Sequence, residues 1–359
     1  MRRWAAAALI GGIALGAAGW APAAVASPPG GSGELFVIAD PRITEASGLA
    51  LSGRHQGVLW MNNDSGAPQL FGVGFDGGVV AVATLEGAEN VDWEAVARGP
   101  NNTLWVGDIG DNDVLREEIV VYRIDEPDLG DTSVAPTRFV LRYPDGLPHD
   151  AEALLVNPVT GRLWIATKEI FGGGLYEAPE QLSTEGVNEL VRIRDVPAVV
   201  TDGTWSADGQ LFVLRDYGRA WIYDPAGNAL GAVELPGQDQ GQNQGESVTF
   251  GPSGVVLLSG TEQANSTIWE IPLAGAGPPT GADGGGGSGA TGAVGTSGGT
   301  SGDTDTDPDT AAAGDQGGII TNTNDPDADD DGGVSPTLIA ILAAIAIAFL
   351  IGRRRGRKT

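Results

Sequence analysis

The middle of the chain repeats itself, and the period of this repeat is the feature that most limits its fold. Each repeat contains a turn followed by a short apolar strand with one core residue, which we use as its anchor. The anchors lie 45, 59, 48 and 45 residues apart, at Trp60, Trp105, Trp164, Phe212 and Leu257. Units of this length, each built from four short strands, are typical of β-propeller blades.

The runs around four of the anchors predict four strands each, separated by Gly, Pro, Asn and Asp. The fifth unit offers only three strands, while a lone strand at residues 35–38 precedes the first unit. Pairing this strand with the last unit would close the ring and remove two exposed edges. We therefore predict an all-β fold, a five-bladed propeller over residues 34–275. Six blades are the alternative, since the second repeat has spare residues.

The N-terminal segment has the pattern of a secretory signal peptide. Arg2 and Arg3 precede an apolar run, and Ala24-Val25-Ala26 fits a small-x-small cleavage site. We assign residues 1–26 to the signal peptide and 27–33 to a leader loop. An uncleaved membrane anchor is the alternative, although the run is short and interrupted by glycines.

The C-terminal part predicts a stalk, a membrane span and a basic tail. Residues 276–333 are dominated by Gly, Ser, Thr, Ala, Pro and Asp, a composition that predicts disorder. We assign residues 334–352, with the strictly apolar run 338–351, to a transmembrane helix. The basic residues of 353–359 follow it, which places the C-terminus in the cytoplasm by the positive-inside rule. We expect a single-pass protein of the cell membrane with an extracellular propeller. A buried helix and a processed sorting signal are the alternatives.

The composition excludes several functions. The chain has no cysteine, so neither a thiolate zinc site nor a cysteine nucleophile is available. Its net charge of −27 disfavours nucleic acid as a partner, because phosphate groups would be repelled.

Carboxylates recur where the innermost strand of each unit begins, about ten to thirteen residues before the anchor. The aligned position holds an acid in four units and Ser47 in the first. The four acids are Glu94, Glu152, Asp202 and Glu246. A ring of buried carboxylates is costly unless a cation neutralises it, and oxygen ligands favour Ca²⁺ as the cofactor. The alternative is that these acids accept hydrogen bonds from backbone N–H groups of neighbouring blades.

A second calcium site is suggested by the acidic turns that follow the anchors. Asp64, Asp108 and Asp111 lie in such turns, and we expect them at the mouth of the channel opposite the start of the innermost strands. Turns rich in Asp and Asn also form without any metal, which is the simpler explanation.

Three further residues are candidates for catalysis. Lys168 and Arg215 could receive an anionic group, or could form salt bridges with Glu169 and Asp216. His149 could donate a proton, or could be an ordinary loop histidine.

Two stretches carry a family resemblance, DWEAVARGP to TLWVGDIGDN (92–112) and HDAEALLVNPVTGRLWIATKE (149–169). They resemble a group of uncharacterised secreted and membrane-anchored β-propeller proteins from actinobacteria and, more distantly, phytase-like and calcium-activated nucleotidase propellers. The resemblance implies a channel lined with acids that hold Ca²⁺. It would make Glu94, Glu152, Asp202 and Glu246 channel ligands, and Lys168 and Arg215 a phosphate contact.

The sequence thus leaves three functions open. The first is a calcium-binding surface module with an extracellular ligand of unknown identity or a structural role. The second is a calcium-dependent phosphoric-ester hydrolase, and the third a lactonase-type propeller. Any enzyme of this kind would be a metal-dependent hydrolase.

Overall fold

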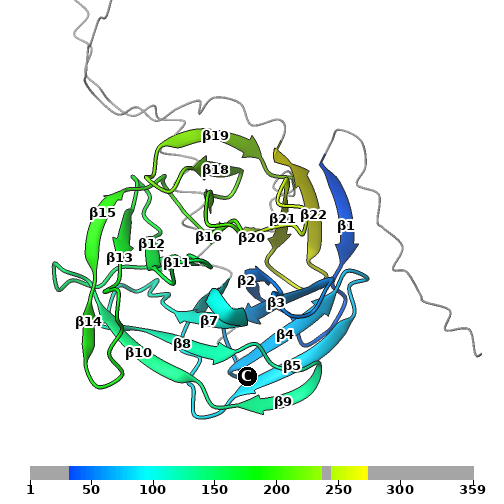
Figure 1. Ribbon diagram of the computed structural model, residues 1–359, viewed down its shortest axis with the longest axis horizontal. Helices are drawn as coiled ribbons and strands as arrows, with labels where there is room; N and C mark the ends of the chain where they lie inside the picture. The colour runs from blue at the N-terminus through cyan, green and yellow to red at the C-terminus, as the bar shows by residue number, and fades with distance from the viewer. Residues whose placement is uncertain (1–31, 237–243, 274–359) are drawn as a thin grey trace, which may run out of the picture. The chain divides into compact units, whose positions relative to one another are not determined.

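The computed structural model describes residues 32–236 and 244–273 and shows a five-bladed β-propeller (Figure 1). Each blade is an antiparallel sheet whose strands succeed one another from the central channel outward. Blade 1 contains β2 (Ala46–Leu51), β3 (Val58–Asn63), β4 (Gln69–Gly74) and β5 (Val79–Leu85). Blade 2 contains β6 (Trp93–Arg98), β7 (Thr103–Asp108), β8 (Ile119–Asp125) and β10 (Thr137–Arg142), with the 3₁₀ turn Pro100–Asn102 between β6 and β7.

The remaining blades follow the same plan. Blade 3 contains β11 (Ala151–Val156), β12 (Leu163–Thr167), β13 (Gly174–Glu177) and β15 (Val191–Asp195). Blade 4 contains β16 (Asp202–Trp205), β17 (Phe212–Arg215), β18 (Arg219–Tyr223) and β19 (Ala229–Glu234). Blade 5 contains β20 (Gly245–Phe250), β21 (Val256–Thr261) and β22 (Thr267–Pro272), and β1 (Gly33–Val37) completes it.

The predicted ring closure is confirmed. β1 pairs antiparallel with β22, with Gly33 opposite Glu270 and Val37 opposite Thr267. The N-terminal strand therefore becomes the outermost strand of the last blade, and the blade count is five.

Two strands were not predicted from the sequence, and both reach back to the preceding blade. β9 (Gly130–Val134) leaves blade 2 and pairs in parallel with β5 of blade 1. β14 (Val187–Glu189) leaves blade 3 and pairs in parallel with β10 of blade 2. The spare residues of the second repeat thus cover an exposed sheet edge and form no sixth blade (Figure 1).

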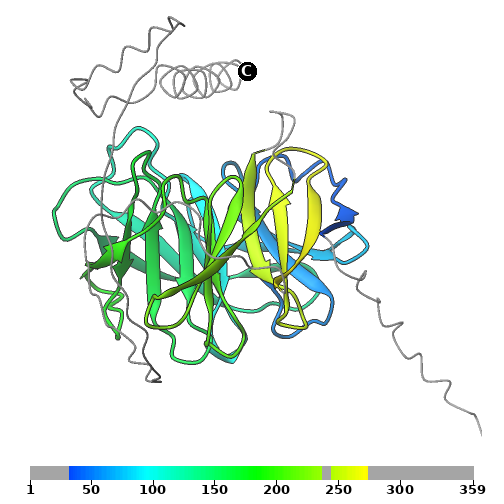
Figure 2. The same ribbon diagram turned by 90° about the horizontal axis from the view of Figure 1, so that it is seen from above.

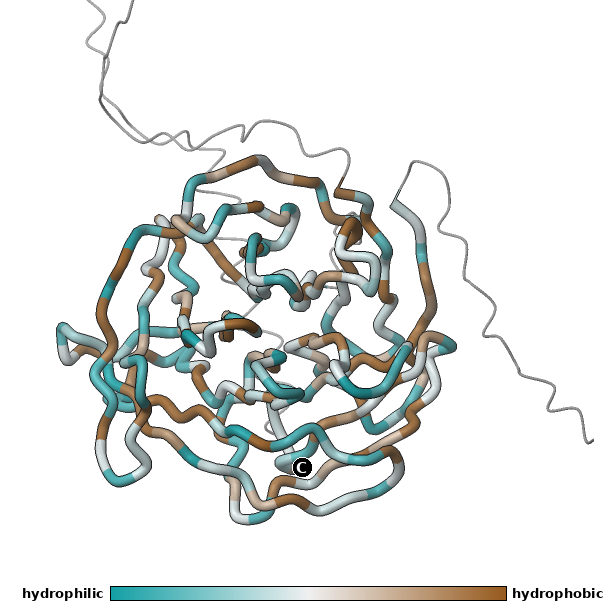
Figure 3. The backbone as a smooth tube through the Cα atoms, viewed as in Figure 1, coloured by the Kyte–Doolittle hydropathy of each residue, from teal (hydrophilic) through white to brown (hydrophobic). Residues whose placement is uncertain are grey.

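The hydrophobic core lies between neighbouring blades. Trp60 of blade 1 is fully buried in a cluster with Trp93 and Leu104 of blade 2, and similar clusters fill the other blade interfaces. Hydrophobic stretches accordingly recur in every blade in Figure 3. The innermost strands of blades 1 and 2 lie very close together. A Cβ atom at Gly48 would be only 2.1 Å from the backbone nitrogen of Val96. Only glycine leaves room for that contact.

In the side view of Figure 2 the strands run between the two faces of the ring, where the loops lie. Among the described residues, no helix is both long and apolar enough to cross a membrane. The predicted signal peptide, stalk, membrane segment and basic tail lie outside the described residues.

Candidate functional site at the channel mouth

The candidate site residues lie at one mouth of the channel, which corrects one expectation from the sequence. Each innermost strand forms a hairpin with the second strand of its blade, so the second strand ends where the first begins. The register pairs Trp93 with Asp108 in blade 2 and Asp202 with Arg215 in blade 4. The prediction that the second strands end at the opposite mouth was therefore wrong. The turns that follow them share a face with the carboxylates of the innermost strands.

The four aligned acids are buried, but their environments differ. Glu94 accepts a hydrogen bond from Ser47 Oγ at 3.1 Å, and Ser47 also donates to the backbone oxygen of Glu94 at 2.7 Å. Burial, together with the charges of Glu152 and Asp92, raises the pKa of Glu94 well above its ordinary value. Blades 1 and 2 are therefore joined through this pair of side chains.

Glu152 has a cation of its own. Lys168 Nζ lies 2.6 Å from Glu152 Oε1, and the ammonium group also lies 5.4 Å from the centre of the Tyr217 ring. Burial raises the pKa of Glu152 to about 7, although Lys168 opposes that rise. Burial disfavours the charged form of Lys168, but the carboxylates of Glu152 and Glu246 outweigh it and raise the lysine pKa well above its ordinary value. Lys168 thus neutralises part of the carboxylate ring from within.

Asp202 serves the backbone. Its Oδ2 accepts the N–H of Val248 on the next blade at 2.7 Å, and its Oδ1 accepts the N–H of Gly203 at the same distance. Burial still raises the pKa of Asp202 well above its ordinary value. Both carboxylate oxygens therefore already accept backbone hydrogen bonds, and the one from Val248 is of the kind that the alternative to a metal site predicted.

Glu246 is the exception in the ring. It is buried, and its Oε2 has no hydrogen-bond partner among the described residues. Burial raises its pKa well above the ordinary value. The charges of Lys168 and Arg215 oppose that rise, whereas those of Glu152 and Glu262 add to it. Glu246 therefore keeps one carboxylate oxygen without a hydrogen-bond partner among the described residues, although the charge of Lys168 acts on it.

Asp64 shows the same property at the neighbouring blade. Its Oδ1 is buried without a partner among residues 32–236 and 244–273. Burial, reinforced by the charges of Glu45 and Glu262, raises the pKa of Asp64 to about 8. Glu262 raises the pKa of both Asp64 and Glu246, so the three carboxyl groups occupy one region where blade 5 meets blade 1. We call Glu45, Asp64, Glu246 and Glu262 the seam acids.

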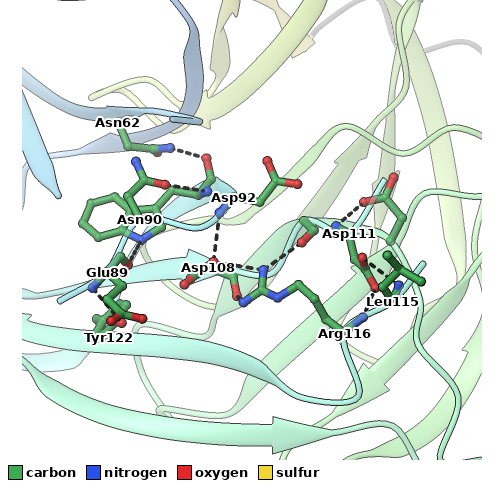
Figure 4. A network of polar contacts seen from close by, with 12 residues as sticks. Asn62, Glu89, Asn90, Asp92, Asp108, Asp111, Leu115, Arg116 and Tyr122 are labelled. Atoms are coloured by element: carbon green, nitrogen blue, oxygen red, sulfur yellow. Dashed lines mark hydrogen bonds and ion pairs between the residues drawn. The ribbon is translucent and has the colours of Figure 1, made fainter. Parts of the chain in front are cut away.

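Asp108 and Asp111 belong to a different network, shown in Figure 4. Arg116 lies 3.0 Å from Asp108 Oδ1 and donates to the backbone oxygen of Gly110 at 2.7 Å. Asp111 accepts the N–H groups of Leu115 and Arg116 at 2.9 and 2.7 Å. These two acids therefore fix the loop after β7, whereas the carboxyl neighbours of Asp64 are Glu45 and Glu262.

The expected salt bridges of the basic residues are not those observed. Lys168 pairs with Glu152 and not with Glu169. Arg215 is fully buried and donates to the backbone oxygens of Ser247 and Gly260 at 2.9 and 3.0 Å. It also donates to Asp216, but to the backbone oxygen and not to the carboxylate. Burial lowers the pKa of Arg215 to about 10. Both side chains are thus engaged inside the protein.

His149 lies at the rim of the mouth. Its Nε2 is 2.8 Å from Asp145 Oδ2 and its Nδ1 is 3.5 Å from Glu169 Oε1, while the ring packs edge-on against Tyr143. These contacts hold two loops of blade 3 together.

Several residues of the mouth were not expected from the sequence, of which Arg116, Glu45 and Glu262 matter most. Arg116 follows an acidic turn closely, and this proximity was the available signal. Glu45 and Glu262 lie next to the strand ends that the repeat aligns. The sequence does not show which way their side chains point.

Comparison with known proteins identifies no family. No family model matches the sequence, and no curated protein matches it significantly. A gluconolactonase from Xanthomonas campestris is similar in structure, with a TM-score of 0.38 and 16% identity over 64% of this chain and 86% of its own. A chain of the nidogen/laminin complex has a TM-score of 0.41 and 16% identity, over 62% of this chain and 74% of its own. A putative gluconolactonase has a TM-score of 0.37 and 17% identity, over 68% and 93%.

Proposed function

We propose that the protein is a membrane-anchored, extracellular binding module whose channel mouth takes up Ca²⁺ at the seam acids. The observation that carries this proposal is the pair of buried carboxylate oxygens, Glu246 Oε2 and Asp64 Oδ1, that have no partner among the described residues. Burial disfavours the charged form of both groups, a bound cation would stabilise that form, and carboxylate oxygens are the ligands that Ca²⁺ prefers.

The donor set fits calcium in chemistry, but the carboxylates would have to move closer to one another to bind it. Within the described ranges, no three acidic or histidine side chains already form a group that could hold a metal ion. Glu246, Glu262 and Asp64 would be the ligands, with the exposed Glu45 beside them. Bound calcium would add positive charge next to the two oxygens that lack a partner and would tie blade 5 to blade 1.

The basic residues favour a binding module over a phosphoric-ester hydrolase. Such an enzyme needs cations that face the substrate phosphate. Lys168 and Arg215 are instead bonded to Glu152 and to backbone oxygens.

The end of β22 lies on the face away from the mouth, because Pro272 pairs with Val256 at the start of β21. A stalk that continues from there begins away from the proposed site.

Isothermal titration calorimetry with CaCl₂ on the full chain in detergent tests the proposal. We expect one saturable site in the wild type and affinity at least about tenfold weaker after Asp64→Asn with Glu246→Gln. Glu185→Gln, an exposed acid far along blade 3, is the control and should bind as the wild type does. Absence of calcium uptake by the wild type would overturn the calcium site. Turnover of p-nitrophenyl phosphate or a simple lactone would overturn the choice of a binding module.

A further inference from the structure

Large hydrophobic side chains are exposed together in the loops of blades 2 and 3 on the mouth face. Fourteen such side chains are exposed among the described residues, and six of them occupy these loops. They are Val91, Val114, Leu115, Leu147, Ile170 and Phe171, which we call the apolar rim. Phe171 is 92% exposed and Leu115 is 76% exposed. On the opposite face Leu129, Val159 and Val255 lie singly in three different turns.

The loops of the apolar rim are bonded to one another. The N–H of Asp111, in the loop after β7, donates to the carboxylate of Asp150 at 2.8 Å. His149, in the loop before β11, lies 3.5 Å from Glu169 in the loop after β12. The N–H of Gly110 donates to the backbone oxygen of Asp92, in the loop that carries Val91, at 3.1 Å. The four loops that carry the rim are therefore joined to one another across two blades.

The loop after β7 is held in place at a cost. Val114 has a φ of 52°, which is unfavourable for a β-branched residue. Asp111 and Arg116 fix the loop on either side of it (Figure 4). Val114 and Leu115 are exposed to solvent. A strained loop with an internal polar network that exposes two apolar side chains is better explained by recognition than by stability.

The charges around the rim are negative. The exposed acids Asp113, Glu117, Asp145 and Glu169 lie in the same loops. Of the nearby cations, Arg116 and Lys168 pair inward with Asp108 and Glu152. Arg142 pairs with Glu118 and Glu189. An anionic membrane surface would be repelled by this charge, as would a second copy of a chain with net charge −27.

We infer that the apolar rim is a docking surface for a protein segment that presents Lys or Arg among apolar side chains. The apolar residues of the partner would pack on Leu115 and Phe171, and its cation would lie against the rim carboxylates. Apolar contact supplies the affinity in such an interface, and the charge pattern selects the partner. The inference goes beyond the calcium proposal and does not depend on it.

Selection of a displayed library of random 12-residue peptides on the full chain in nanodiscs, in EDTA, tests the inference. We expect enriched peptides with Lys or Arg beside apolar residues. Fluorescence anisotropy should show at least about tenfold weaker binding to Leu115→Ser with Phe171→Ser. The matched control, Val159→Ser with Val255→Ser, removes two exposed apolar residues from the opposite face and should leave binding unchanged.

Several results would overturn the inference. They are enrichment no greater than on empty nanodiscs, enrichment of acidic peptides, and equal binding by the rim variant. A dimer of the full chain that the rim variant dissociates would assign the surface to a second copy instead. Because EDTA is present throughout, failure of the calcium proposal would not affect the outcome.

Discussion

The two sides of the channel mouth are built from equivalent strand ends, yet the acidic side chains on them have different partners. On the side of blades 2 and 3, Arg116 pairs with Asp108 and Lys168 pairs with Glu152. On the side of blades 5 and 1, burial and neighbouring acids raise the pKa of Asp64 and Glu246, and Lys168 only opposes the rise at Glu246. Each of the two keeps an oxygen without a hydrogen-bond partner among the described residues. The repeat thus places carboxylates on both sides. The residues around each carboxylate determine whether it forms a direct ion pair with a basic side chain of the protein.

This difference separates acids that stabilise the fold from acids that remain for a ligand. Where the chain provides its own cation, the carboxylates fix loops and join blades. Where no cation contacts the carboxylate directly, burial of its charged form remains a cost that a bound cation would lower. The apolar rim lies on the self-neutralised side, so cation binding and partner docking would use different halves of the mouth.

Lys168→Met should have the largest effect, because it turns the self-neutralised side into an uncompensated one. The variant strands the buried carboxylate of Glu152, and we expect the free energy of unfolding to fall by about 3–5 kcal/mol. Urea unfolding at pH 7.5 measures it. Adding Glu152→Gln removes the stranded charge and should restore much of the loss. Equal stability of Lys168→Met and the wild type would mean that the pair is not neutralising the ring.

Arg116→Met should cost less, since the side chain is partly exposed. It removes the ion pair with Asp108 and the hydrogen bonds to backbone oxygens, for an expected loss of about 1–3 kcal/mol. Hydrogen–deuterium exchange should accelerate in residues 109–118 and little elsewhere. Arg142→Met breaks the exposed pair with Glu118 and is the control, with an expected loss below about 1 kcal/mol. Unchanged exchange in this loop would show that Arg116 does not fix it.

Asp64→Asn should have the smallest effect and the opposite sign. The folded-state pKa of Asp64, about 8, lies above its ordinary value of 3.8. Its contribution to stability is therefore complete below about pH 4 and is lost as the pH rises through 8. Without calcium, the wild type should lose melting temperature between pH 5 and pH 8, and the variant should lose less. At pH 8 the variant should melt about 2–4 °C higher, if removing the repulsion is worth about 1 kcal/mol. A steeper pH dependence in the variant than in the wild type would contradict this.

The fold could be predicted from the sequence because turn residues mark nearly every strand and the period counts the blades. β9 and β14 were missed because their residues are half-polar and gain their place only from a neighbouring edge. The repeat also located the aligned acids, but not their partners. At the same aligned position Asp202 accepts backbone hydrogen bonds, whereas Glu246 keeps an oxygen without a partner among the described residues. The partners of each carboxylate depend on the length of its side chain and on the path of the neighbouring loops, which the repeat does not encode.

The most direct test compares the aligned acids on the two sides, Glu246 of blade 5 and Glu94 of blade 2. Each is replaced by Gln in the full chain, and the melting temperature is measured in EDTA and in CaCl₂ at pH 7.5. We expect calcium to raise the melting temperature of the wild type and of Glu94→Gln alike, while Glu246→Gln loses most of the shift. A calcium shift that survives Glu246→Gln and disappears in Glu94→Gln would contradict the proposed site, because it would place the cation on the side that the chain already neutralises.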